Sequence, residues 1–141
     1  MKGAMRDTRQ AVKRIWHIES GDYASASRVR KEFSAYLKQA AVPDSDCEAA
    51  VLIFGELIAN ALTHGRGPVR SSLGPGPTCA ILWVEDAGEG FALERVALPA
   101  RGQCAGRGIF IAKSLARSIH VARVKGDRFR VSVELPVRLN T

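Results

Sequence analysis

The sequence predicts an α+β sandwich, with helices on one face of a mixed sheet. Three observations predict this class: two long helical segments follow one another early, strand-like segments lie on either side of them, and a third helical segment precedes a closing hairpin. A chain of 141 residues is long enough to close one hydrophobic core. We therefore expect an N-terminal tail over residues 1–11 and one domain over residues 12–141.

The first predicted elements are a strand and a helix. Residues 11–20, AVKRIWHIES, alternate partially between apolar and polar positions, which is typical of a strand. Residues 22–42 have apolar side chains at helical spacing, namely Val29, Phe33, Tyr36 and Leu37. Asp22 is suited to cap this helix at its start, and Pro43 marks its far boundary.

A second helix is predicted over residues 44–65, DSDCEAAVLIFGELIANALTHG, which is apolar nearly all the way round. Asp44 or Ser45 is expected to cap its start, and Gly65 is expected to end it. Residues 65–78, GRGPVRSSLGPGPT, are rich in glycine and proline, so we expect turns and at most a poor strand there.

The second half of the chain begins with a strongly predicted strand at residues 79–88, CAILWVEDAG. Residues 91–105 resemble a loop, and residues 106–120, GRGIFIAKSLARSIH, predict a third helix. The residues expected to face inward from that helix are Ile109, Ala112, Leu115, Ala116 and Ile119. Residues 121–137 predict a hairpin that turns at Lys125–Gly126–Asp127. Its expected buried positions are Val131, Val133 and Leu135.

The composition bears on whether the protein is associated with a membrane and on the redox state of its cysteines. The chain has no apolar run near the roughly 18 residues of a membrane helix and no apolar segment of a secretory signal, so we expect no membrane association. The cysteines are odd in number, widely spaced and free of any CxxC pattern. They are Cys47, Cys79 and Cys104. Reduced thiols in a cytoplasmic protein are therefore expected.

The charges are unevenly distributed along the chain, whose net charge is +7. Residues 1–40 carry nine basic and four acidic side chains, residues 41–100 carry three and eight, and residues 101–141 carry nine and two. This arrangement is consistent either with an anion or acidic protein as partner, or with a solvated surface that binds nothing. Aromatic residues are few and no recognition-helix pattern occurs, so no direct nucleic-acid binding is expected.

Three short stretches depart from the pattern of a simple core. In the second helix, Glu56 and Asn60 lie four residues apart and therefore on one side. A buried carboxylate requires a partner or a cavity, whereas the simpler alternative is one solvent-exposed stripe. Asp86 ends an apolar strand and is followed by Gly88 and Gly90, which allow close approach of a ligand to the backbone. The simpler alternative there is an ordinary acidic turn.

The third stretch, GQCAGRGIF, is a glycine-rich loop that runs into a helix. Gly106 and Gly108 flank Arg107 at the predicted helix start, where backbone amides attract phosphate. The Lys-Ser/Thr of a Walker A loop is absent, and the position is too late in the chain for a dinucleotide fingerprint. A flexible loop before a helix is the simpler alternative.

Taken in order, the three stretches resemble the sequence boxes of one family. ELIANALTHG resembles the N box of the GHKL, or Bergerat-fold, ATPases, EDAGEGF resembles their G1 box, and GRGIFIAKSLA resembles their G2 box. Within that superfamily the chain is most similar to the bacterial anti-sigma-factor serine/threonine kinases, over about residues 12–137. The resemblance implies a two-layer histidine-kinase-like ATPase domain with a mostly antiparallel sheet.

The resemblance also implies roles for individual residues. Glu56 would be the general base, and Asn60 would bind Mg²⁺ through its side-chain oxygen. Asp86 would bind the adenine amino group of ATP, with Gly88 and Gly90 close to the nucleotide. The lid over the phosphates would contain the glycines at 106 and 108, and the position of Arg107 between them suggests a phosphate contact.

Three functions remain open from the sequence. The first is an anti-sigma-factor-type kinase that phosphorylates a small STAS-type antagonist and controls a sigma factor, and therefore transcription. The second is a nucleotide-gated binding module without phosphotransfer, suggested by a short lid over residues 92–105 and by GDRFRV where the family usually has Gly-Thr. The third is a stand-alone histidine-kinase catalytic domain. Kinases of the first group often form homodimers, and the first strand and helix could supply an interface.

Overall fold

The computed structural model describes residues 12–96 and 107–140, and its five strands form one sheet in the order β1-β2-β3-β5-β4. The strands are β1 (Arg14–Ile18), β2 (Val69–Gly74), β3 (Ile81–Asp86), β4 (Ser118–Val124) and β5 (Arg128–Glu134). All four pairings between them are antiparallel, so the mixed sheet predicted from the order of elements is wholly antiparallel within the described residues.

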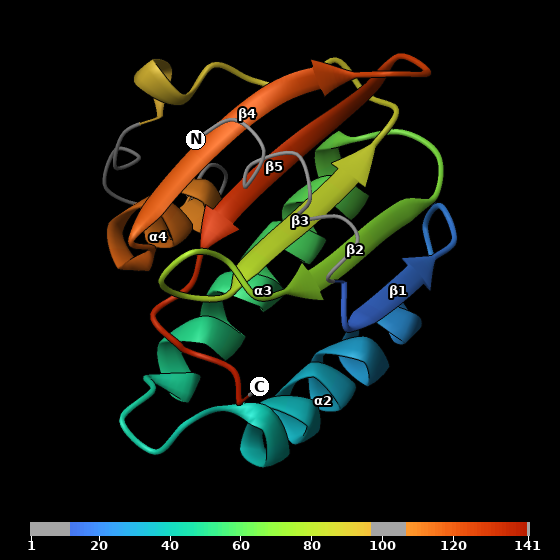
Figure 1. Cartoon of the computed structure of the whole chain (residues 1–141). Helices are drawn as coiled ribbons and strands as arrows, with labels where there is room; N and C mark the ends of the chain where they lie inside the picture. Colours follow the sequence, from blue (N-terminus) through green and yellow to red (C-terminus); the bar gives the residue numbers. More distant parts are fainter. Residues whose placement is uncertain (1–11, 97–106, 141) are drawn as a thin grey trace.

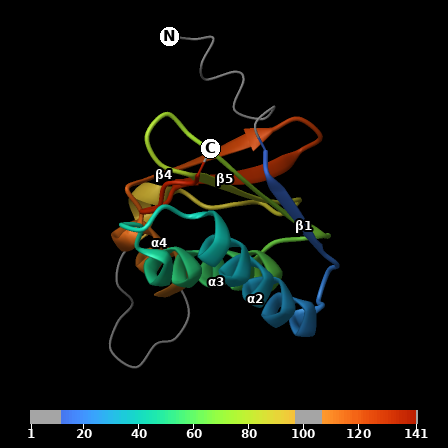
Figure 2. The same ribbon diagram turned by 60° about the horizontal axis from the view of Figure 1, so that its bottom comes forward.

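Three helices cover one face of this sheet, which confirms the predicted α+β class (Figures 1 and 2). They are α2 (Tyr23–Ala40), α3 (Cys47–His64) and α4 (Arg107–Leu115). The hydrophobic core lies between the two layers and contains buried side chains from the three helices and from β1, β2, β3 and β5, and the partly buried Ile119 and Val121 of β4 pack against it. None of the described helices lies over the opposite face of the sheet in either view.

The N-terminal elements follow their sequence patterns closely. Trp16 and Ile18 of β1 face the core, and the stripe of α2 is buried as predicted, with Tyr36 packed at its edge. Asp22 caps α2, because its side chain accepts hydrogen bonds from the hydroxyl and the backbone amide of Ser25. These bonds hold the pKa of Asp22 below its usual value. The cap therefore stabilises the fold above the ordinary carboxyl pKa, and its contribution is lost as pH falls through the lowered value.

The centre of the core is a cluster of three aromatic rings that ties β1 to two helices. Phe33 and Phe54 are stacked with centroids 4.1 Å apart, and the Trp16 ring stands edge-on to both at 5.6 and 5.4 Å. Aromatic pairs of this kind each add about 0.5–1.5 kcal/mol beyond the area they bury. The cluster therefore fixes α2 and α3 relative to the sheet.

α3 is the central helix of the structure. By length and composition it is the one described helix that could cross a membrane, contrary to the expectation from the sequence, although 39% of it is buried. The core helix of a soluble protein passes the same test, and seven residues of α3 pack inside the fold. The N-cap differs from both predicted candidates. It is Asp46, whose side chain accepts from the amide of Ala49, whereas Ser45 bonds to Arg138 near the C-terminus.

The glycine- and proline-rich segment after α3 forms a regular strand, so the prediction of a poor strand was wrong. β2 pairs with β1 on one side and with β3 on the other. Val69, Ser71 and Leu73 face the core in alternation and are buried. Pairing on both edges outweighs weak local propensity, because strand formation depends on neighbouring strands more than on the segment itself.

The third helix is shorter than predicted. α4 ends at Leu115, which is exposed, although Ile109 and Ala112 are buried as expected. Ala116 follows the helix and Ile119 belongs to β4, where it pairs with Val133. The residues expected to continue the helix instead extend the hairpin, because β-branched side chains there gain cross-strand partners on β5.

The loop and the hairpin otherwise agree with the sequence. Leu93–Arg95 form one 3-10 turn within the predicted loop, whose remainder after residue 96 lies outside the described residues, as does the predicted tail. The hairpin turns at residues 125–127, with Gly126 and Asp127 at φ of 77° and 60°. The three predicted core positions of the hairpin are buried.

Candidate functional site

The polar stripe of α3 lies beside the start of α4. Glu56 and Asn60 are both half-buried and are flanked by the fully buried Leu57 and Ile58. A Cβ added at Gly108 would stand 2.8 Å from Glu56 Oε1 and 3.6 Å from its Cβ. The absence of a side chain at Gly108 therefore allows the first turn of α4 to lie against this carboxylate. Glu56 is neither enclosed in the core nor on an open stripe.

Asp86 lies at the end of β3 and points to the end of α3. Its side chain is only 8% exposed, and Oδ1 accepts a hydrogen bond of 2.6 Å from the backbone amide of Gly88. A Cβ at Gly65 would stand 2.5 Å from Asp86 Cγ and 2.5 Å from the carbonyl oxygen of Ala61. Gly65 has a φ of −89°, so space rather than backbone angle requires a glycine here. The sequence predicted Gly65 only as a helix end.

The carboxylate of Asp86 retains capacity to accept hydrogen bonds. Within the described residues, its Oδ2 receives no hydrogen bond from protein, whereas its Oδ1 is held by Gly88. A buried carboxylate with one oxygen fixed and one free suits an amino group of a ligand.

Arg123 and Phe129 contact the loop that follows Asp86 and hold it in place. Arg123 donates from Nη1 to the carbonyl oxygen of Gly88 at 2.8 Å and from Nη2 to that of Glu89 at 2.6 Å. Gly90 has a φ of 81°, and a Cβ there would overlap the ring of Phe129. The guanidinium of Arg123 lies 5.6 Å from that ring. Gly90 therefore allows both a left-handed backbone turn and close packing against the ring of Phe129.

Arg123 and Phe129 were not identified from the sequence. One available signal was the position of Arg123, because residues 119, 121 and 123 of β4 face the helical layer in alternation and an arginine is unusual there. Phe129 pairs with Asp86 across β3 and β5, a contact between residues far apart in sequence.

The lid is only partly described. Gly106 lies outside the described residues, and Arg107 begins α4 with its side chain outside them. The predicted phosphate contacts of these two residues stay predictions. No group of three His, Cys, Asp or Glu side chains that could hold a metal occurs within the described residues. The half-buried amide of Asn60 fits Mg²⁺, which in nucleotide sites takes one or two protein ligands and completes its shell with phosphate and water oxygens.

Comparison with known proteins defines the class. The family of histidine kinase-like ATPase domains matches residues 20–133, and the chain belongs to this family. The resemblance to the GHKL superfamily noted in the sequence is therefore confirmed. Among curated proteins, no match was found.

Two solved structures share the fold at low sequence identity. One contains the RsbU and RsbW domains of Rv1364c from Mycobacterium tuberculosis, with 19% identity and a TM-score of 0.56, and the match covers 92% of this chain and 35% of that chain. The other is the histidine kinase AdeS of Acinetobacter baumannii, with 18% identity and a TM-score of 0.51, covering 99% and 77%. At these identities the likeness concerns the fold.

Proposed function

We propose that the chain is an ATP-binding serine/threonine protein kinase of the anti-sigma-factor type. It would transfer the γ-phosphate of ATP to a Ser or Thr of a small STAS-type antagonist, and thereby control a sigma factor. The observation that supports this is the pair of close approaches along α3. Gly65 allows the carboxylate of Asp86 to lie against one end of the helix, and Gly108 brings the start of α4 to Glu56 about two turns earlier.

Each residue has a distinct role in this proposal. Asp86 accepts from the exocyclic amine of adenine, and Gly88 and Gly90 would lie close to the nucleotide. Glu56 accepts the proton of the acceptor hydroxyl as the new phosphate ester forms, and its half-burial beside Gly108 holds it near the lid. Asn60 supplies a side-chain oxygen to Mg²⁺, which spreads the charge of the triphosphate when bound.

The start of α4 would bind the phosphates. Backbone amides at a helix start carry partial positive charge and are free to donate, because they have no partner within the helix. Gly106 and Gly108 would let these amides approach closely, and Arg107 would add a charged contact.

Two measurements test the proposal. Calorimetric titration with Mg-ATP is expected to show binding to the wild type and a loss of at least about tenfold in Asp86→Ala, since a buried hydrogen bond to the base is removed. Phosphotransfer from labelled ATP to a STAS-type antagonist is expected to be lost in Glu56→Ala and kept in Glu48→Ala, which changes an exposed carboxylate in the first turn of the same helix. A wild type that does not bind nucleotide refutes the proposal.

One observation favours the alternative of a nucleotide-gated module that binds a partner without phosphorylating it. Asp127 follows Gly126 in the GDRFRV stretch, where the family usually has Gly-Thr, and its exposed carboxylate lies 3.8 Å from Nη1 of Arg123. A carboxylate at this position cannot donate a hydrogen bond to a phosphate as a threonine hydroxyl can. If the chain is such a module, we expect it to bind ATP and to bind its partner with an affinity that changes with nucleotide. We then expect no phosphotransfer even in the wild type.

A stand-alone histidine-kinase catalytic domain is the third possibility, and it shares its fold with the AdeS structure. That activity requires a phosphoacceptor histidine on a dimerising helix pair. The three histidines of this chain lie on β1, at the end of α3 and on β4, and all are exposed. They are His17, His64 and His120. We propose in addition that the protein is cytoplasmic, forms a homodimer and does not bind nucleic acid directly.

A further inference from the structure

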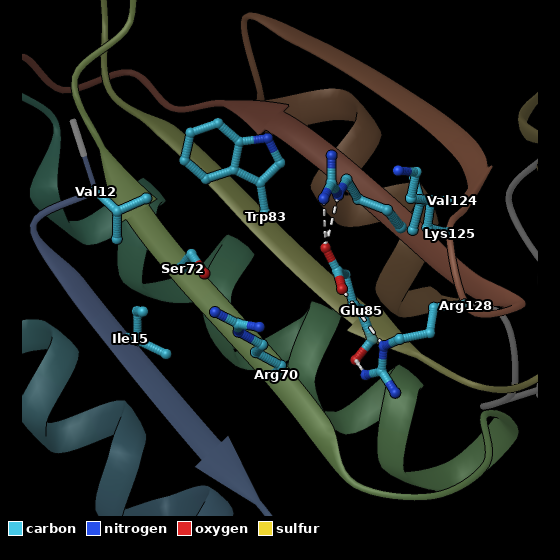
Figure 3. Close-up of a pocket in the computed structure, with 10 residues that line it drawn as sticks. Val12, Ile15, Arg70, Ser72, Trp83, Glu85, Val124, Lys125 and Arg128 are labelled. Carbon is cyan, nitrogen blue, oxygen red and sulfur yellow. Dashed lines mark hydrogen bonds and ion pairs between the residues drawn. The ribbon is translucent and has the colours of Figure 1, made fainter. Parts of the chain in front are cut away.

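The face of the sheet away from the helices carries a row of charged side chains in register. Arg70 on β2 stands opposite Glu85 on β3, which stands opposite Arg130 on β5. Residues directly opposite on neighbouring strands have their side chains within interaction distance. Figure 3 shows Arg70, Glu85 and Arg128 on this face, with the helices behind the sheet.

Glu85 is the one carboxylate among these cations. Its Oε2 lies 2.7 Å from both Nε and Nη2 of Arg130, and its Oε1 lies 3.4 Å from Nε of Arg128. Arg128 also donates from Nη2 to the carbonyl oxygens of Pro68 and Glu85. Glu85 is thus held by two guanidinium groups at once.

The remaining positive charge has no acidic partner among the described residues. Arg70 and Lys125 line the same hollow, are exposed, and form no ion pair with any described residue. The Nη1 atoms of Arg128 and Arg130 also donate to no described group. Four cations therefore surround one carboxylate, and several guanidinium donors are available to an outside acceptor.

These side chains surround a hollow of about 820 Å³, which we call the outer pocket. It is lined by Val12, Ile15, Arg70, Ser72, Trp83, Glu85, Val124, Lys125, Arg128 and Arg130. Val12 and Ile15 stand at one end, at the first strand, and Val124 stands at the other, at the β4–β5 hairpin, with the charged row and Trp83 of β3 between them (Figure 3). Ile15 is 45% exposed, which leaves apolar surface open beside the cations. The size lies within the range of ligand-binding pockets.

We propose that the outer pocket binds an acidic segment of a partner protein in which a central run of carboxylates is flanked at both ends by apolar side chains. Carboxylates would occupy the free donors of Arg70, Arg128 and Arg130, and apolar neighbours would cover Ile15 and Val124. The proposal does not depend on phosphotransfer, because the outer pocket and the candidate nucleotide site lie on opposite faces of the sheet.

The charge and exposure of the pocket residues argue against three other occupants, namely a second copy of the chain, its own residues 1–11 and nucleic acid. A second copy packed symmetrically on this face would place four cations against four cations. Residues 1–11 carry Lys2, Arg6 and Arg9 against one Asp7, so their charge has the same sign as the pocket. Single-stranded nucleic acid bound by base stacking requires an accessible ring, and Trp83, the only aromatic side chain that lines the pocket, is 8% exposed.

The test uses a fluorescein-labelled peptide of about eight residues with glutamates at its centre and valines at both ends, long enough in extended form to cross the pocket. Fluorescence anisotropy at about 50 mM salt, where screening is weak, measures its affinity for the whole chain. The pocket variant is Arg70→Glu with Lys125→Glu, two exposed side chains without ion-pair partners among the described residues. The control is Lys31→Glu with Lys38→Glu, which makes the same change in net charge on exposed positions of α2.

The pocket variant is expected to weaken peptide binding by at least about tenfold, and the control by less than about twofold. A peptide with glutamine in place of glutamate is expected not to bind. The proposal is overturned if the glutamate peptide does not bind the wild type, if both variants weaken it equally, or if the glutamine peptide binds as well. It is also overturned if the chain is a dimer that the pocket variant alone dissociates, since a second copy would then be the occupant.

Discussion

Replacing Gly108 by alanine is expected to displace the carboxylate of Glu56 without lowering the stability of the fold. The added Cβ would stand 2.8 Å from Glu56 Oε1, whereas ordinary contacts begin at 3.4 Å. The nearest atom is the end of a flexible side chain, so the carboxylate moves and the backbone does not. Gly55→Ala is the matched control, because it also lies in a helix and its Cβ would meet only the side chain of Arg30, 3.3 Å away.

The structure gives the expected size of the effect. Glu56 has to withdraw by at least the difference between 2.8 and 3.4 Å, and a displacement of about 1 Å of a reacting group costs on the order of a hundredfold in rate. Alanine is more favourable than glycine in a helix by up to about 1 kcal/mol, so neither substitution should lower the melting temperature. Turnover of Mg-ATP is therefore expected to fall about a hundredfold in Gly108→Ala and to stay unchanged in Gly55→Ala.

The assay combines steady-state ATP turnover, calorimetric Mg-ATP binding and thermal unfolding on the same preparations. Loss of turnover with retained stability and binding within about threefold agrees with a displaced base. Wild-type turnover in Gly108→Ala refutes the role of Glu56 as the base or its proximity to α4. Equal loss of turnover in the Gly55 control would show that the change acts through the helix rather than through the carboxylate.

Three further substitutions test other contacts. Gly65→Ala should lower Mg-ATP affinity by at least about tenfold in calorimetry and lower stability by about 2 kcal/mol, because its Cβ would overlap Asp86 and a backbone carbonyl; unchanged affinity contradicts this. Arg123→Ala should raise the KM for ATP several-fold while kcat stays within about twofold, because it holds only the loop beside Asp86; a loss confined to kcat would disagree. In urea unfolding, Asp46→Ala should cost about 1 kcal/mol through loss of the cap, whereas Asp44→Ala should be nearly neutral, and the reverse order would rule out this cap.

The elements that were predicted correctly are those whose signals are local. α2 and α3 combine side-chain spacing of 3.6 residues with capping groups inside the same segment, and the hairpin turn carries its own Gly-Asp pair. β2 was underestimated and α4 was extended too far because their lengths are decided by pairing with strands elsewhere in the chain. Such pairing leaves no trace in the segment's own composition.

The distinction between local signals and contacts between distant segments also applies to the candidate site. The acidic and glycine residues were found because each occupies a recognisable place at a helix or strand end. The distances between them were not predictable, since Gly65 meets Asp86 from 21 positions away and Arg123 meets Gly88 from 35 positions away. Sequence spacing therefore identified the candidate residues, and packing of α3 on the sheet explains why they meet.

Glu85 and Asp86 are joined by one peptide bond and point to opposite faces of β3. A ligand on either face that shifts this strand end moves the side chain on the other. Reciprocity then requires that any factor by which nucleotide changes peptide affinity is the same factor by which peptide changes nucleotide affinity. Nucleotide binding on one face and peptide binding on the other thus form a single thermodynamic cycle. A substitution at Glu85 therefore has to be assayed against both ligands before its effect is assigned to one face.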